Sequence, residues 1–189
     1  MFAHSSSRSM SKKIFSAARL LTIAVSGVVL IGSIAQAADS SLSHTDTSFL
    51  KSAAQGGNTE VEASKVALEK STNPDVKAFA QKMIDEHSKV GDTVKKLAGS
   101  KNVTVPDKPS LAQRAKIDVL SKFNGASFDQ HYASMIGVSA HKNTIALFEK
   151  ESAKGKDPDV TRFATETLPA LKGHLAMAND LQAKVDAQK

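Results

Sequence analysis

Apolar side chains recur every three or four residues from residue 48 to near the C-terminal end of the chain, which is the period of an amphipathic α-helix. The clearest stripe lies within residues 74–98, where a histidine is the one polar member. No comparable stretch alternates between apolar and polar residues as a half-buried β-strand would. The pattern therefore predicts an all-α protein. The stripe consists of Val76, Phe79, Met83, His87, Val90, Val94 and Leu97.

Capping residues mark the ends of the predicted helices. Segments 73–75 and 157–159 each place Asn or Asp before a proline and an acid after it, which is favourable N-cap and first-turn chemistry. Capping-box pairs and glycines mark further ends. The pairs are Ser110 with Gln113 and Ser127 with Gln130, and the glycines are Gly99 and Gly155. These signals predict helices over 46–71, 74–98, 110–122, 127–154 and 158–186.

Two adjacent glycines, Gly56 and Gly57, interrupt the first predicted helix. Each glycine inside a helix costs about 1 kcal/mol relative to alanine, so a compensating contact is expected. We predict close packing against the alanine-rich helices beside it, and a local break of the helix or a gap for a ligand is the alternative.

The lengths of the connections predict how the helices are arranged. Only a few residues separate the first long helix from the second, and the third from the fourth, whereas the connection 99–126 spans 28 residues. Short, long, short is the pattern of a ferritin-like four-helix bundle, in which two antiparallel hairpins are joined by one crossover. We therefore expect this all-α fold, with the long crossover carrying the short helix at 110–122.

An internal repeat indicates that the two hairpins are related. Residues 73–80 and residues 157–164 share the same capping pattern, a valine and a Phe-Ala pair, at a shift of 84 positions. We interpret the repeat as pseudo-symmetry between the hairpins. Independent convergence on the same capping chemistry is the alternative.

The first 37 residues have the organisation of a cleavable signal peptide. A basic start precedes an apolar run from Leu20 to Ile34, and the small residues Ala35 and Ala37 predict cleavage before Ala38. The run holds 15 residues, fewer than the roughly 20 of a membrane-spanning helix. We predict a signal peptide at 1–37, a flexible mature N-terminus at 38–47 and the bundle domain at 48–187.

Removal of this segment changes the electrostatics. The whole chain has 25 Lys and Arg against 19 Asp and Glu, a net charge of +6, whereas the mature segment has 21 against 19, which leaves +2. Because the remaining basic residues are interspersed with acids, nucleic acid is not an expected partner. The absence of cysteine excludes thiol catalysis, thiolate metal sites and a lipid anchor on an N-terminal cysteine.

The predicted location is the periplasm, which the protein would reach by export across the inner membrane. A cysteine-free chain suits an oxidising compartment. We expect no membrane span to remain after cleavage, and association with the outer membrane stays open.

No enzyme signature is present in the sequence. It contains no glycine-rich phosphate loop, no GxSxG elbow and no HExxH motif. A ferritin-like di-iron centre would need a Glu three residues before a His on two helices. Apolar residues stand at that position before each candidate histidine, so the standard di-iron centre is not supported. They are Ile84 before His87, Val138 before His141, and Leu171 before His174.

Each of the four long helices nevertheless carries one ligand-capable side chain within its apolar stripe. Counted from the hairpin turns, the members of each hairpin's pair are level, and the two pairs differ by about 5 Å in depth at a rise of about 1.5 Å per residue. The register between hairpins is open, so the four side chains either converge or form two layers. The candidate metal ligands are Glu60, His87, His141 and His174.

Three imidazoles and one carboxylate would suit zinc, iron, copper or manganese. Two alternatives remain for the histidines, which either hold a polar core together through hydrogen bonds or face solvent. Glu60 has its own alternative, because a modest rotation of its helix would place it with Glu62 in solvent.

Several motifs together resemble the domain of unknown function 4142 family. The resemblance covers about residues 48–183 and implies an exported bacterial protein with a ferritin-like four-helix fold, often labelled putative outer membrane protein, with no settled activity. An acid often precedes the third-helix histidine in the family, and here Ala140 stands in its place, which argues against a carboxylate-rich metal centre. The motifs are Phe49 to Gly57 leading into Glu60-Val61-Glu62, Val76 to His87, Phe128 to Tyr132, and Leu168 to Leu175.

Three functional hypotheses follow, and no particular ligand, partner or cofactor is predicted. The first is a non-enzymatic helical binding or stress-protection module of the cell envelope. The second is a metal-binding or oxidase-like bundle that uses the inward His and Glu side chains. The third is a partner for envelope proteins or polymers, which would bind through solvated lysine-rich faces.

Overall fold

The computed structural model describes residues 42–188, and this range is helical with no β-strand. The expected signal peptide at 1–37 lies outside the described residues, as do residues 38–41 of the expected flexible segment 38–47. The first helix begins at His44, four residues before the expected domain start. The helices are α1 (His44–Lys70), α2 (Pro74–Ser100), α3 (Leu111–Leu120), α4 (Gly125–Tyr132), the π-helix η1 (Ala133–Ala140), α5 (His141–Lys154) and α6 (Pro158–Ala187).

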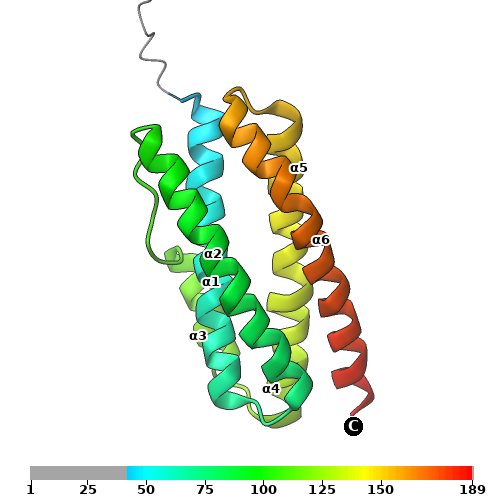
Figure 1. Cartoon of the computed structure of the whole chain (residues 1–189). Coiled ribbons are helices and arrows are strands. Elements are labelled where there is room, and N and C mark those ends of the chain that lie inside the picture. Colours follow the sequence, from blue (N-terminus) through cyan, green and yellow to red (C-terminus); the bar gives the residue numbers. More distant parts are fainter. Residues whose placement is uncertain (1–41, 189) are drawn as a thin grey trace, which may run out of the picture. The chain divides into compact units, whose positions relative to one another are not determined.

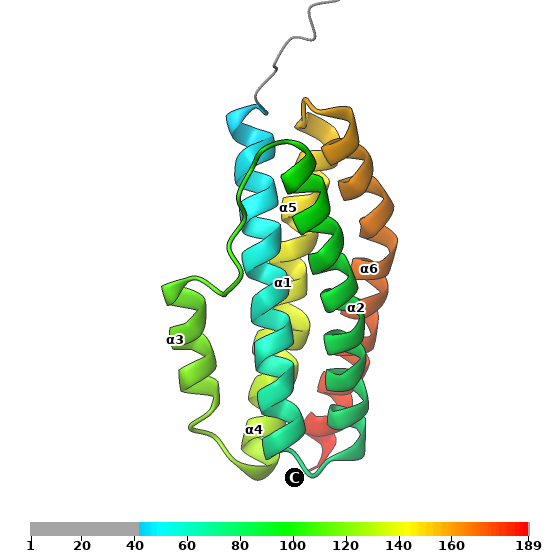
Figure 2. The same cartoon turned by 60° about the vertical axis from the view of Figure 1, so that its left-hand side comes forward.

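Two antiparallel hairpins pack into a four-helix bundle (Figure 1). One hairpin is α1 with α2, and the other joins the continuous rod α4–η1–α5 to α6. The crossover between them carries α3, which lies alongside α1 on the outside of the bundle (Figure 2). The predicted all-α bundle of two hairpins with a long crossover is confirmed. Within residues 42–188, no helix is both long and apolar enough to cross a membrane.

The caps explain why the helices start where they do. The side chain of Asn73 accepts hydrogen bonds from the backbone N–H groups two and three residues later, and Asp157 does the same at the start of α6. Ser110 and Gln113 form the predicted reciprocal capping box. The expected box of Ser127 with Gln130 is wrong, because α4 begins two residues earlier, at Gly125.

The sequence repeat extends to contacts between the hairpins. Lys184 near the end of α6 lies 2.8 Å from Asp75 in the first turn of α2. Lys101 at the end of α2 lies 2.8 Å from Asp159 in the first turn of α6. Asp75 and Asp159 occupy equivalent positions of the repeat. The two ends of the bundle are therefore closed by matching ion pairs, which favours pseudo-symmetry over convergence of two caps.

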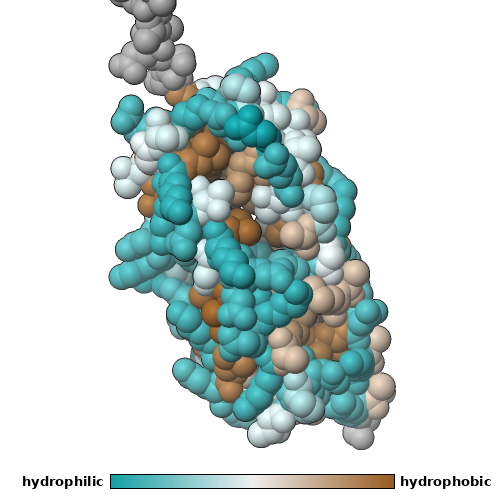
Figure 3. Space-filling model, viewed as in Figure 1, coloured by the Kyte–Doolittle hydropathy of each residue, from teal (hydrophilic) through white to brown (hydrophobic). Residues whose placement is uncertain are grey.

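The apolar core of the described residues is divided into two clusters along the bundle. One cluster lies toward the α1–α2 turn and the other toward the α5–α6 turn. On α2, for example, Met83 belongs to the first cluster and Val94 to the second, with His87 between them. Hydrophilic side chains cover most of the face shown in Figure 3, where apolar residues show in separate patches. The fold thus places a polar layer in the middle of an apolar interior.

Candidate metal centre

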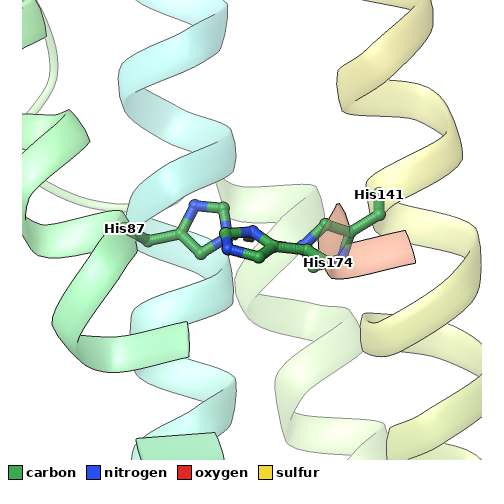
Figure 4. Close-up of side chains that lie close together, drawn as sticks. All are labelled: His87, His141 and His174. Atoms are coloured by element: carbon green, nitrogen blue, oxygen red, sulfur yellow. Dashed lines mark hydrogen bonds between the residues drawn. The ribbon is translucent and has the colours of Figure 1, made fainter. Parts of the chain in front are cut away.

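Three buried histidines meet in this central layer. His87 comes from α2, His141 is the first residue of α5, and His174 comes from α6, and none is more than 3% exposed. Their rings point toward one another inside the bundle (Figure 4). One ring nitrogen of each lies within 4.8 Å of the others. The histidines of the two hairpins therefore meet in one layer. The solvent-facing alternative for them is wrong.

The spacing of two of these rings matches the requirement of a metal ion. Nε2 of His87 lies 3.3 Å from Nε2 of His141. Two nitrogens that bind one tetrahedral zinc ion at about 2.0–2.1 Å are themselves separated by about 3.3–3.4 Å. The same separation also allows one neutral imidazole to donate a hydrogen bond to the other. The geometry therefore fits either a shared ion or a hydrogen-bonded pair.

Glu60 of α1 lies on the Nδ1 side of the His87 and His141 rings. Its Oε2 is 2.9 Å from Nδ1 of His87, and its Oε1 is 3.7 Å from Nδ1 of His141. The residue is 1% exposed, so the solvent-facing alternative is wrong for it too. Among the described residues, neither oxygen accepts a well-directed hydrogen bond. A carboxylate beside Nδ1 leaves Nε2 of the same ring available to a metal, so this position orients the rings.

Glu86 is a functional candidate that the sequence patterns missed. Its Oε2 lies 2.5 Å from Nε2 of His174, and its other oxygen pairs with Lys82. The remaining ring nitrogen of His174, Nδ1, is buried and has no hydrogen-bond partner within residues 42–188. Glu86 precedes His87 in the chain, and successive helical positions face different neighbours, which is why it contacts α6. It supports His174 as Glu60 supports His87.

The π-helix η1 ends directly before His141 and was not predicted. The sequence pattern indicated a single α-helix over 127–154, whereas the middle of this rod, Ala133–Ala140, is π-helical. π-Helical turns are often found at functional sites. Nδ1 of His141 lies 3.3 Å from the carbonyl oxygen of Ile136, five residues earlier. The available sequence signal was the run from Met135 to Val138, which has no polar residue, whereas one narrow α-helical stripe would alternate with polar positions. The structure buries all of residues 136–138.

The electrostatics of the centre favour a charged Glu60 beside the imidazoles. Burial alone would raise the pKa of Glu60, but the neighbouring histidines, His87 foremost, outweigh it and lower that pKa. Burial likewise opposes a charge on His87, yet Glu60 raises the pKa of this ring. Burial, together with the other two rings, lowers the pKa of His174. The raised pKa of His87 favours its protonated form, which pairs with Glu60, whereas the lowered pKa of His174 favours the neutral ring, which is the state that binds metal.

The side chain of Glu86 is also held as an anion. Its hydrogen bonds to Lys82 and then to His174 lower its pKa to about 2. It is about one third exposed, so solvent screens its charge more than that of Glu60. Two carboxylates of different exposure thus flank the three rings.

The glycine pair of α1 lies close to this centre without the predicted close packing. A Cβ atom added at Gly56 would meet only the Thr144 hydroxyl, at 3.8 Å, and one added at Gly57 would meet no atom of the described chain within 4 Å. The expectation of a tight helix contact is therefore wrong. Gly56 instead lines a cavity that also reaches Glu60.

Comparisons with known proteins establish a family. Searches of curated proteins and of solved structures found no match. A family model described as a domain of unknown function, DUF4142, matches residues 32–181, which is most of the chain and includes all four candidate ligands. The chain therefore belongs to the DUF4142 family.

Proposed function

We propose that this bundle is a metal-binding module of the cell envelope, in which three histidines hold one divalent transition-metal ion. The observation that carries the proposal is the convergence of ring nitrogens from His87, His141 and His174 within 4.8 Å. Imidazole nitrogen is a borderline ligand that suits zinc, copper, iron and nickel. The donor set is rich in imidazole and differs from a carboxylate-based di-iron centre.

Each histidine has a defined role in this proposal. His87 and His141 bind through Nε2, since their Nδ1 atoms face Glu60. His174 binds through Nδ1, since Glu86 occupies Nε2. Glu60 and Glu86 act as orienting carboxylates, which hold ring tautomers and raise ligand basicity, and neither is a direct ligand. Apolar clusters on both sides of the layer keep bulk water from the ion.

The proposed location is the periplasm. Support comes from the basic, apolar and Ala-x-Ala order of residues 1–37 and from the cysteine-free sequence. We propose binding alone, because no recognised catalytic motif accompanies the centre.

The main alternative is a metal-free polar core. In that case a charged Glu60–His87 pair and the His87–His141 hydrogen bond would hold the helices together, in keeping with a non-enzymatic stress-protection module. A polar core would be expected to satisfy its buried atoms. Here Nδ1 of His174, the nitrogen that we propose as a ligand, is buried and has no hydrogen-bond partner in the part of the chain that is described, which favours an ion.

Elemental analysis of the protein purified from periplasm tests the proposal. We expect about one transition-metal ion per chain, as a single three-histidine site requires, and its loss in His87→Ala. His44→Ala, at an exposed position of α1, is the matched control and should keep the metal. A metal-free wild-type protein that also fails to take up added Zn²⁺ would overturn the proposal.

A further inference from the structure

A cavity of about 300 Å³ lies between α1, α3, η1 and α5, next to the candidate centre. Glu60 forms part of its wall, together with exposed residues such as Lys116 and Ser139, so the cavity connects the surface with the buried carboxylate. Glu60 therefore lies between the cavity and the three histidines. Its oxygens lie beside the imidazoles of His87 and His141, and its side chain borders the cavity.

The wall of the cavity is rich in neutral oxygen donors. Hydroxyl groups come from Thr59, Ser139 and Thr144, and an amide oxygen comes from Asn143. Hydroxyl, carbonyl and carboxylate oxygens are hard donors that can replace water around a divalent cation. Among the described residues of this wall, Glu60 is the one buried charge. The wall chemistry thus suits a hydrated cation more than an anion or an apolar molecule.

The size of the cavity agrees with this ligand. Six waters around a metal ion occupy about 180 Å³ at about 30 Å³ each. The cavity volume of about 300 Å³ exceeds this, so a hydrated ion fits without opening the bundle. The direct surroundings of the three histidines are apolar clusters, through which a charged ion would pass only at a high cost in desolvation.

We propose that the cavity is an outer binding site for a hydrated divalent cation, and that the ion passes from it to the three histidines with Glu60 as its first protein ligand. This inference rests on the proposed metal centre. Glu60 replaces part of the hydration shell on the cavity side, after which the imidazole nitrogens replace the rest. Glu60 then remains beside Nδ1 of His87 as an orienting carboxylate.

Gly56 leaves the cavity open, because a side chain at this position would project toward Thr144 across it. Gly56→Met should therefore obstruct the route, while Gly57→Met makes the same chemical change where no described atom lies within 4 Å of an added Cβ. We expect Gly56→Met to slow both association and release of Zn²⁺ about tenfold or more, with Kd within about twofold of wild type, because an entry route changes both rates equally. Gly57→Met should keep the wild-type rates.

Lys116 gives an independent test of opposite sign. Its exposed cationic side chain lines the cavity and repels an approaching cation. Lys116→Glu should speed Zn²⁺ association by about tenfold at low ionic strength, and the gain should shrink as salt screens the charge. Lys77→Glu, the same charge change at an exposed position of α2, is the control and should leave the rate close to wild type.

Stopped-flow mixing of metal-free protein with Zn²⁺ measures these rates, and thermal unfolding checks that each variant is folded. Wild-type association rates in both folded Gly56→Met and folded Lys116→Glu would overturn the entry route while leaving the metal centre intact. Absence of Zn²⁺ binding in the wild-type protein would instead overturn the proposed function. Slowed association and release of Zn²⁺ in Gly56→Met, together with wild-type rates in Gly57→Met, would support the route.

Discussion

Two buried glutamates in this bundle have opposite proton affinities. Glu60 and Glu151 are 1% and 2% exposed, and each has an oxygen without a hydrogen-bond partner among the described residues. The pKa of Glu60 is lowered, because the neighbouring histidines outweigh its burial. The pKa of Glu151 is raised to about 7 by burial and then by Asp46. Burial sets the cost of a charge, and the neighbours decide whether the residue carries it.

The surroundings of Glu151 explain its difference from Glu60. Asp46, in the first turn of α1, accepts hydrogen bonds from the backbone N–H groups of Lys156 and Asp157, at 2.9 and 3.1 Å. Although burial would raise the pKa of Asp46, these and other hydrogen bonds lower it. Asp46 therefore keeps the negative charge and Glu151 keeps the proton. Asp46 thus links α1 to the α5–α6 turn, whereas Glu60 is a buried anion stabilised by the neighbouring histidines.

The largest effect that this comparison predicts is a pH dependence of stability from Glu151. Between about pH 4.5 and pH 7 the folded protein keeps a proton that the unfolded chain has released, so the free energy of unfolding falls as pH rises, by up to about 3 kcal/mol. Glu151→Gln should abolish this loss. Urea denaturation at pH 5 and pH 8 measures it in both proteins.

Glu166→Gln, at an exposed position of α6, is the control for that measurement and should keep the wild-type pH profile. The difference between wild type and Glu151→Gln isolates Glu151 from other groups that titrate in the same range. The same pH dependence in both proteins would mean that Glu151 is ionised in the folded state.

A second prediction compares the same substitution at the two glutamates. Glu60→Gln removes the charge beside His87 and should weaken Zn²⁺ binding by about 10- to 100-fold, as expected when an orienting carboxylate is lost. Glu151→Gln should bind Zn²⁺ like wild type, because Glu151 lies outside the three-histidine group. Calorimetric titration of metal-free protein measures both affinities. Equal affinities in the two variants would remove Glu60 from the centre.

The smallest effect is expected at Glu86. This residue supports His174 but is about one third exposed, so water replaces part of what it provides. Glu86→Gln should weaken Zn²⁺ binding by up to about tenfold, less than Glu60→Gln. The same titration ranks the two carboxylates. A larger loss at Glu86 than at Glu60 would reverse their proposed order.

Local patterns predicted the helices and the candidate residues well. Asn73, Asp157 and Ser110 act through neighbours two or three residues away, so their capping could be recognised in the sequence. Glu60 and His87 stood out because each lies on an apolar stripe. A polar residue that interrupts such a stripe must be buried or must break the helix face, and here both are buried.

Contacts between distant segments could not be predicted in the same way. The register between the hairpins depends on side-chain packing, so the convergence of His87 with His141 was one of two open outcomes. The partnership of Glu151 with Asp46 joins residues more than a hundred positions apart. The π-helical turn before His141 changes the helix period itself, which a fixed period of 3.6 residues cannot reveal.

A crystal structure of the Zn²⁺-loaded protein with anomalous scattering data tests the central claim most directly. We predict one zinc peak about 2.0–2.1 Å from Nε2 of His87, Nε2 of His141 and Nδ1 of His174. The carboxylate of Glu60 should remain beside Nδ1 of His87. Zinc bound only at the protein surface, or absence of zinc from a layer in which the three rings keep their hydrogen bonds, would contradict the account.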